Sequence, residues 1–437
     1  MGKFFHFQSP LNSQSSDHSE PNQYSESSSD TSIASQPSLP SVPSLQQPTA
    51  AAIHHCSSTL KTQSSQIFSL THAGKHLYCG GADGSITVCD RSLQNPDLTA
   101  AAKSSSAVKS ISICGDRVFA AHQDHKIRVW KMDARQPELN KIAVLPTLGD
   151  RCARFFSPKN YVKIRRHKRS TWIHHVDAVS ALALNGNSSL LYSASWDRSF
   201  KVWRTSDFKC LESVQNAHDD AINAVVLSSD GVLYTGSADR KIKVWKRREG
   251  EGKHSLVSTL EKHRSGVNAL ALNGDGSVLY SGACDRSIVV WEKSGHGHMA
   301  VAGALRGHTK AILCLGVVNE VVFSGSADKS VRVWRRGSGY SYSYSCAAVL
   351  DGHTNPVKCL TASFECSHNN GHSFVVYSGS LDCEVKVWKI WVPFTNLMSE
   401  DGHSWDAAKV KASFPEEWST VILSIDAIDP SKEDEWI

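Results

Sequence analysis

One short pattern recurs seven times between residues 79 and 388, and it constrains the fold more than any other feature of the chain. Each copy has small residues before an aspartate, and six of the seven then run through alternating residues to a tryptophan. The copies are CGGADGSITVC (79–89), AAHQDHKIRVW (120–130), SASWDRSFKVW (193–203), TGSADRKIKVW (235–245), SGACDRSIVVW (281–291), SGSADKSVRVW (324–334) and SGSLDCEVKVW (378–388). Successive aspartates lie 41, 73, 42, 46, 43 and 54 residues apart, which indicates a unit of just over 40 residues with two insertions.

The repeat predicts an all-β chain. Alternation in residues 241–245 (KIKVW) is typical of a strand with one buried face, and a repeat of this length matches one four-stranded propeller blade. One such blade cannot bury its faces alone, so we expect residues 58–394 to form a seven-bladed β-propeller. Because Ser58-Thr59-Leu60 resembles Ser258-Thr259-Leu260, residues 58–61 are predicted to add the outer strand of blade seven.

Three segments lie outside the repeat. Residues 1–57 are rich in Ser, Pro and Gln, and we expect a disordered leader because such a segment buries too little apolar surface to fold. Residues 146–174 form a basic insertion between blades two and three, with eight Lys and Arg against one Asp. Residues 395–437 form an acidic tail, with ten Asp and Glu against three Lys. The insertion and the tail are predicted either to bind partners or to screen each other.

Five repeats carry a histidine upstream of the aspartate, and here the chain resembles the WD-repeat family. The resemblance implies a structural tetrad of histidine, hydroxyl, aspartate and tryptophan in each of these blades. In such a tetrad the carboxylate orients the imidazole, and the hydroxyl accepts the indole N–H. The expected tetrads are His175, Ser193, Asp197 and Trp203; His218, Thr235, Asp239 and Trp245; His263, Ser281, Asp285 and Trp291; His308, Ser324, Asp328 and Trp334; and His353, Ser378, Asp382 and Trp388.

The same residue types raise the question of a Ser-His-Asp hydrolase, which the repetition argues against. A catalyst needs one exposed nucleophile, whereas this chain has five copies and no G-x-S-x-G elbow. Blades one and two keep Asp83 and Asp124 but lack the upstream histidine, and they have Cys79 and Ala120 at the hydroxyl position. We therefore expect no catalytic residue, and we expect these two blades to be the least stable.

The resemblance also implies where partners bind. In the family, exposed contacts come from the residue before the turn aspartate and from the start of the inner strand, which here are Trp196, Leu381, Asn223, Asn268, Leu313 and Lys358. Trp196 is a candidate hot spot, or it packs beneath the basic insertion. The insertion offers Lys163, Arg165, Arg166, Lys168 and Arg169, which predict a partner site or a nuclear address, with a solvated loop or a contact with the acidic tail as the alternative.

Within the WD-repeat family the chain is most similar to the plant JINGUBANG-like group. The similarity lies in the Ser-rich leader, the segment Lys159-Asn160-Tyr161-Val162 with the basic run that follows it, and Trp172-Ile173 before Asp177-Ala178-Val179. It implies a regulatory adaptor that restrains pollen germination and tube growth through transcription-factor partners. The alternatives are a substrate receptor of a cullin-type ubiquitin ligase, for which the expected Trp-Asp-x-Arg box is missing, and a trafficking scaffold.

Other classes of protein are disfavoured by simple absences in the sequence. No apolar run approaches the roughly 18 residues of a membrane span, and no two of the 12 cysteines are spaced as C-x-x-C. Phosphate-loop and H-E-x-x-H motifs are missing, as is any segment typical of a groove-reading helix. We therefore expect a monomer in the cytoplasm, the nucleus or both, which binds other proteins and uses no cofactor, no metal and no direct sequence-specific contact with nucleic acid.

Overall fold

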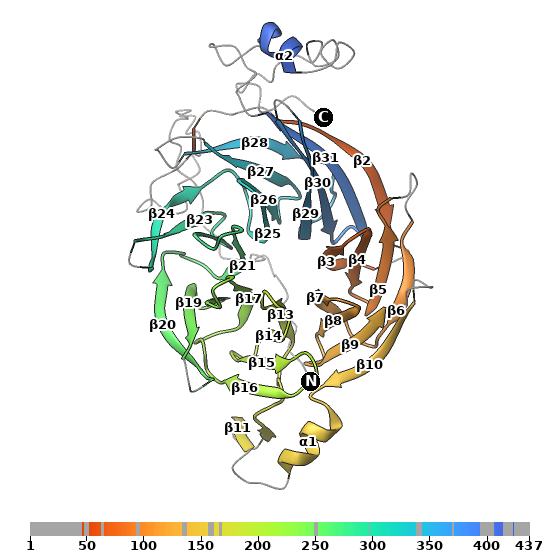
Figure 1. Cartoon of the computed structure of the whole chain (residues 1–437), viewed down its shortest axis with the longest axis vertical. Coiled ribbons are helices and arrows are strands. Elements are labelled where there is room, and N and C mark those ends of the chain that lie inside the picture. The colour runs from red at the N-terminus through yellow and green to blue at the C-terminus, as the bar shows by residue number, and fades with distance from the viewer. Residues whose placement is uncertain are drawn as a thin grey trace, which may run out of the picture. The chain divides into compact units, whose positions relative to one another are not determined.

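The structure is a computed structural model, and it describes residues 46–47, 52–62, 65–92, 97–132, 138–155, 161–165, 168–248, 252–295, 297–337, 343–368, 371–393, 406–413 and 423. Within these residues, seven sheets surround a central axis, each with one strand near the axis and the others stacked toward the rim (Figure 1). The predicted all-β, seven-bladed propeller is therefore confirmed.

The first three blades are four-stranded and follow the chain from the axis outward. Blade one contains β3 (Ile67–Ala73), β4 (His76–Gly81), β5 (Ser85–Asp90) and β6 (Thr99–Lys103). Blade two contains β7 (Val108–Cys114), β8 (Arg117–His122), β9 (Ile127–Met132) and β10 (Leu139–Leu145). Blade three contains β13 (Val179–Leu184), β14 (Leu190–Ser195), β15 (Phe200–Arg204) and β16 (Cys210–Val214).

The next three blades repeat this order. Blade four contains β17 (Ile222–Leu227), β18 (Leu233–Ser237), β19 (Lys241–Arg247) and β20 (His254–Glu261). Blade five contains β21 (Val267–Leu272), β22 (Val278–Ala283), β23 (Ile288–Lys293) and β24 (Met299–Leu305). Blade six contains β25 (Ile312–Val318), β26 (Val321–Ser326), β27 (Val331–Arg336) and β28 (Tyr344–Leu350), and β1 (Gln46–Gln47) pairs in parallel with β28.

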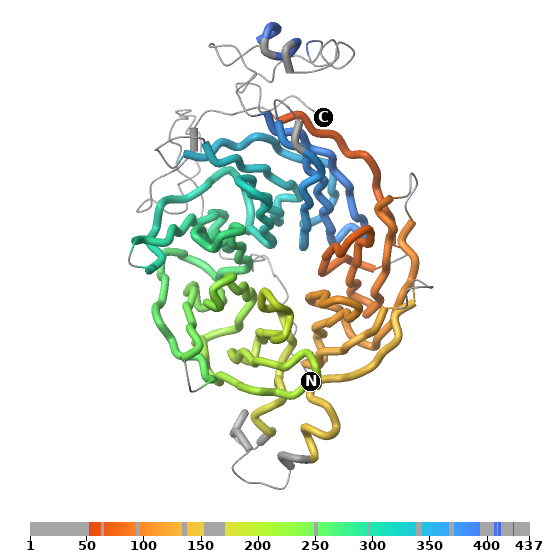
Figure 2. Tube along the Cα trace, in the orientation of Figure 1, coloured from red at the N-terminus to blue at the C-terminus, as the bar shows by residue number. Residues whose placement is uncertain are grey.

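Blade seven is assembled from both ends of the repeat region. It contains β29 (Val357–His368), β30 (Gly371–Ser380) and β31 (Glu384–Pro393), and β2 (Ile53–Lys61) forms its outer strand (Figure 2). Leu60 pairs with Val385, and both side chains are buried in one apolar cluster. This confirms that residues 58–61 close the last blade.

The predicted boundary of the leader at residue 57 is wrong, because strand β2 begins at Ile53. Residues 53–56 pair with residues 388–391, and Gln46–Gln47 pairs with blade six. The sequence does not reveal this strand because it lies at the outer edge of the ring, where His55, Cys56 and Ser57 are exposed and no apolar alternation is needed. Apart from residues 46–47 and 52–57, the leader lies outside the described residues.

The hydrophobic core lies between neighbouring blades. Phe119 and Val129 of blade two, for example, pack with Leu191 and Trp203 of blade three, and all four are at most 1% exposed. Because each sheet buries both of its faces against its neighbours, the stability of a blade depends on the blades beside it.

The described part of the basic insertion contains regular secondary structure. It contains helix α1 (Leu148–Phe155) and a hairpin of β11 (Tyr161–Arg165) and β12 (Lys168–Thr171). The hydroxyl of Thr147 caps α1 by accepting the N–H of Asp150, and the Asp150 carboxylate accepts the N–H of Cys210 in β16. The insertion is therefore anchored at the outer strand of blade three.

The acidic tail contributes helix α2 (Ala407–Ser413), whose Val410 is fully buried against Ile53 and Trp391 of blade seven. None of the described helices is both long and apolar enough to span a membrane.

Candidate partner-binding site on the turn face

Every blade makes the same turn at its repeated aspartate. The residue before the aspartate donates its N–H to a carbonyl just before or at the start of the inner strand, as Trp196 does to Ala178 in blade three at 3.0 Å. The residue after the aspartate has a positive φ, which is +67° for Arg198 and +83° for Gly84. The Asp197 carboxylate accepts the N–H of Ser199 at 2.9 Å. A short carboxylate at this position satisfies a tight turn by itself, and Asp83 in blade one accepts the N–H of Ser85 in this way without a histidine.

In blades three to seven the residues of each predicted tetrad lie in one hydrogen-bonded chain. In blade six, Trp334 Nε1 donates to Ser324 Oγ at 2.8 Å, so the hydroxyl proton is directed to His308 Nε2 at 2.8 Å. The other ring nitrogen, Nδ1, then donates to Asp328 Oδ2 at 2.7 Å. The same three contacts, between 2.8 and 3.1 Å, join His175, Ser193, Asp197 and Trp203; His218, Thr235, Asp239 and Trp245; His263, Ser281, Asp285 and Trp291; and His353, Ser378, Asp382 and Trp388.

The pKa values and the burial of the tetrad residues are typical of a structural hydrogen-bond network. Burial lowers the pKa of His175 and of His353, so both imidazoles are held neutral. Burial raises the pKa of Asp239, but the hydrogen bond and charge of His218 outweigh it and hold that pKa at about 2. The five hydroxyl-bearing residues have 0% exposure, so none of these oxygens can reach a substrate.

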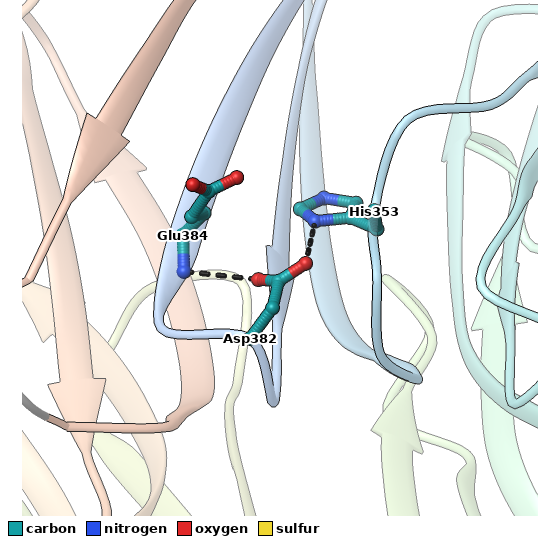
Figure 3. A group of neighbouring side chains, drawn as sticks. All are labelled: His353, Asp382 and Glu384. Carbon is teal, nitrogen blue, oxygen red and sulfur yellow. Dashed lines mark hydrogen bonds and ion pairs between the residues drawn. The ribbon is translucent and has the colours of Figure 1, made fainter.

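Blade seven also brings a second acidic group, Glu384, close to its tetrad, and His353, Asp382 and Glu384 together have the residue types of a metal site (Figure 3). His353 and Asp382 already bond each other, and Asp382 Oδ1 accepts the N–H of Glu384 at 3.0 Å. The Glu384 carboxylate pairs with Lys386 at 3.3 Å and with Lys61 at 3.5 Å. A metal ion bound here would have to displace the tetrad and both lysines.

The two blades that lack the histidine satisfy their turns differently. In blade one, Asp83 accepts the hydroxyl of Ser85 at 2.6 Å. In blade two, Arg128 forms two hydrogen bonds to Asp124, at 2.9 and 2.6 Å. Because position 120 is alanine, the buried indole N–H of Trp130 has no hydrogen-bond partner among the described residues.

Each inner strand has a shift in pairing register at its turn end, and this shift leaves one residue of the inner strand without a partner in the neighbouring strand. In blade three, for instance, the pairs Val179–Ser195 and Ala181–Ala194 leave Ser180 between them. Such bulges re-aim a side chain. Five of the bulge residues line a cavity on the axis of the ring: Phe68, Lys109, Ser180, Asn223 and Leu313. The seven bulge residues are Phe68, Lys109, Ser180, Asn223, Asn268, Leu313 and Lys358.

Four of these seven residues were predicted from the sequence, and Phe68, Lys109 and Ser180 were missed. Ser180 follows His175 by five residues, as Asn223 follows His218, so the same count would have found it. Blades one and two have no histidine from which to count. There the signal is the distance to the turn aspartate, because Phe68 and Lys109 each lie fifteen residues before it, as Leu313 does in blade six.

A cavity of about 240 Å³ lies on the axis, and residues of all seven inner strands line it. Phe68 and Lys109 line it on one side, and the Lys109 ammonium lies 4.2 Å from the centre of the Phe68 ring. The same ammonium lies 5.4 Å from the ring centre of Trp196, which is 39% exposed. Burial, together with the charge of Lys358, lowers the pKa of Lys109 to about 8. We call Phe68, Lys109, Trp196 and Lys358 the channel-mouth cluster.

The predicted asparagines, Asn223 and Asn268, form hydrogen bonds between neighbouring blades. Asn223 donates its side-chain amide to the carbonyl of Val267 at 3.0 Å, and Asn268 donates to that of Ile312 at 2.8 Å. Each amide therefore ties its blade to the next one. Leu313 lines the cavity and is half-buried, as is Leu381 before the turn of blade seven.

Among the described residues, Trp196 and helix α1 of the basic insertion contact different strands of the propeller. Trp196 contacts the inner strand of blade two through Lys109, whereas α1 contacts the outer strand of blade three through Asp150. Trp196 therefore lies toward the inner strands, and α1 lies at an outer strand. The side chains of Lys163, Arg165, Arg166, Lys168 and Arg169 lie outside the described residues.

Comparison with known proteins also supports a propeller built from repeats. The family described as WD domain, G-beta repeat matches residues 166–204, 208–246, 254–292, 300–335 and 344–389, which correspond to blades three to seven. A comparison with curated proteins found no match. Propellers of this family are typically non-enzymatic scaffolds for protein interactions. The matched repeats and the seven-bladed ring support the assignment of this chain to the WD-repeat family.

Proposed function

We propose that this chain is a non-enzymatic adaptor that binds a partner protein at the channel-mouth cluster. This cluster lies on the face of the propeller that carries the aspartate turns, which we call the turn face. The observation that carries the proposal is Trp196, a large aromatic side chain that is 39% exposed beside a cavity. Aromatic residues that fill or border pockets contribute most of the free energy at many protein interfaces. The buried hydroxyls of the tetrads support the absence of catalysis on the same blades.

The test is affinity capture with the full chain and two matched variants. Trp196→Ala removes the proposed contact, and Leu256→Ala removes a side chain of the outer strand β20 that is 47% exposed. We expect Trp196→Ala to lose the captured partners and Leu256→Ala to keep them, with unchanged thermal midpoints for both. If both variants retain the same partners, the site is not at Trp196.

We further propose that the partner is a transcription factor and that the chain restrains pollen germination, as the similarity to the JINGUBANG-like group implies. Support comes from residues 159–162, the basic run that follows them and residues 172–173, which carry that similarity. Pollen that lacks the protein should then germinate faster than wild-type pollen. An unchanged germination rate, with no transcription factor among the captured partners, would contradict this proposal.

The proposed location is the nucleus, the cytoplasm or both, with the basic run of the insertion as a nuclear address. Its support is the charge of the segment, eight Lys and Arg against one Asp over residues 146–174. A fluorescent fusion in which Arg165, Arg166, Lys168 and Arg169 are alanine should leave the nucleus. Equal nuclear fluorescence in the variant and the wild type would exclude this role.

A further inference from the structure

We propose that the channel mouth holds one anionic group of the bound partner, a carboxylate or a phosphate, between Lys109 and Lys358. This inference rests on the proposed partner-binding function, and it adds the chemistry of the group that the site recognises. The two lysines come from blades two and seven, on either side of the Phe68 bulge of blade one.

The first argument is that these two cations have no acidic partner in the described part of the chain, where neither forms an ion pair or a hydrogen bond with the protein. Other lysines near the turns are paired: Lys241 lies 3.4 Å from Asp219, and Lys386 lies 3.3 Å from Glu384. An ammonium group has three N–H donors, so both side chains retain donors that a ligand can use.

The second argument is the electrostatic repulsion between Lys109 and Lys358. Lys109 is partly removed from water, and its pKa falls because of this burial and because of the positive charge of Lys358. A bound anion at Lys109 would relieve this repulsion between the two positive charges. The site is therefore electrostatically complementary to a negative group, and a group with two negative charges would neutralise it fully.

The third argument is that two aromatic rings contact the Lys109 ammonium. Phe68 and Trp196 hold it from two blades, with ring centres 4.2 and 5.4 Å away. Contacts with aromatic faces fix the position of a cation but do not neutralise its charge. The lysine is thus held in place before a ligand arrives, and this lowers the conformational entropy lost on binding.

The fourth argument concerns the size and lining of the cavity. Its volume of about 240 Å³ falls below the roughly 300–1,000 Å³ of typical small-molecule sites, so it suits one side chain rather than a cofactor. Among the described residues no Asp or Glu lines it, and its polar lining there consists of Lys109, Asn223 and serines such as Ser69 and Ser180. An anion in the cavity therefore meets no carboxylate among these lining residues.

The test uses the full chain and two simple anions, inorganic phosphate and acetate. Limiting acetic anhydride labels unprotonated lysines, and mass spectrometry compares the labelling of Lys109 with that of exposed Lys253 on the opposite side of a blade. We expect phosphate or acetate, but not chloride at matched ionic strength, to slow the labelling of Lys109 by roughly tenfold. Lys358→Met should abolish this protection. Equal labelling in all three salts would overturn the proposal.

Affinity capture separates this proposal from the one on which it rests. If Trp196→Ala loses the partner and the Lys109→Met, Lys358→Met double variant keeps it, the adaptor function stands and the anion site is wrong. If the double variant loses the partner while Lys253→Met keeps it, the anion site is supported. Phosphatase treatment of the lysate then identifies the source, because loss of capture indicates a phosphorylated partner and retention indicates a carboxylate.

Discussion

Trp334 in β27 donates its indole N–H to the hydroxyl of Ser324 in β26 over 2.8 Å, and this bond links the third strand of blade six to the second. The same hydroxyl bonds His308, so one buried oxygen satisfies two buried groups. Blade two contains the equivalent tryptophan, Trp130, without any such acceptor in the described residues. The propeller therefore has five blades with a complete polar network and two without one.

Removing the central hydroxyl of a tetrad should destabilise the whole ring. Ser324→Ala leaves the indole N–H of Trp334 and one nitrogen of His308 buried without a partner, at a cost of roughly 2 kcal/mol or more. Urea denaturation should show a lower midpoint for this variant than for Ser206→Ala, an exposed substitution of the same type. Equal midpoints would mean that the network contributes no net stability.

The reverse substitution should stabilise blade two. Ala120→Ser would place an acceptor near Trp130, and its hydroxyl proton could reach the carbonyl of Arg128, as Ser281 reaches that of Val289 in blade five. We expect a gain of about 1 kcal/mol in the free energy of unfolding, together with slower amide exchange in β8 and β9. A loss of stability would show that the site has no room for the oxygen.

Closure of the ring should depend on strand β2. Leu60→Asp places an unpaired charge among the buried residues of blade seven, next to Val385, and should lower the thermal midpoint sharply. His55→Asp adds the same charge at an exposed position of the same strand and should change the midpoint little. A small effect of both substitutions would contradict the role of β2 as the closing strand.

Blade two should also confer a dependence of stability on pH. Burial, with a further contribution from Arg128, lowers the pKa of His122 from 6.5 to about 4 despite its hydrogen bond to the Ser106 carbonyl. Between these two values the unfolded chain binds the proton and the folded chain does not, so stability falls as pH decreases from about 6.5 to about 4. The full effect of this one group is up to about 3 kcal/mol.

The measurement is the free energy of unfolding across this range in the wild type and in His122→Phe. The variant loses a hydrogen bond at every pH, so the slope rather than the absolute value is diagnostic. We expect a shallower slope in the variant, and the wild-type slope in His55→Gln, where the ring is exposed. Parallel slopes in all three proteins would assign the acid sensitivity to other groups, such as His175 and His353, whose pKa values are also lowered by burial.

Part of the candidate site could be predicted from the sequence in the blades that carry a tetrad histidine. Asn223, Asn268, Leu313 and Lys358 could be found because each follows a tetrad histidine by five residues. Phe68 and Lys109 could not be found in this way, because their blades lack the histidine. The helix in the insertion and the first half of β2 were also missed, since neither carries an apolar pattern that faces the common core.

The number of blades, the positions of the turn aspartates and the five tetrads were determined by the sequence alone. All of these depend on short-range spacing that repeats along the chain, and alternation and turn chemistry act over a few residues. Only the tertiary structure decided that Phe68, Lys109 and Trp196 from three blades meet around one ammonium group. The reason is ring closure, which brings inner strands more than a hundred residues apart to the same axis and so creates the one place where their bulge residues converge.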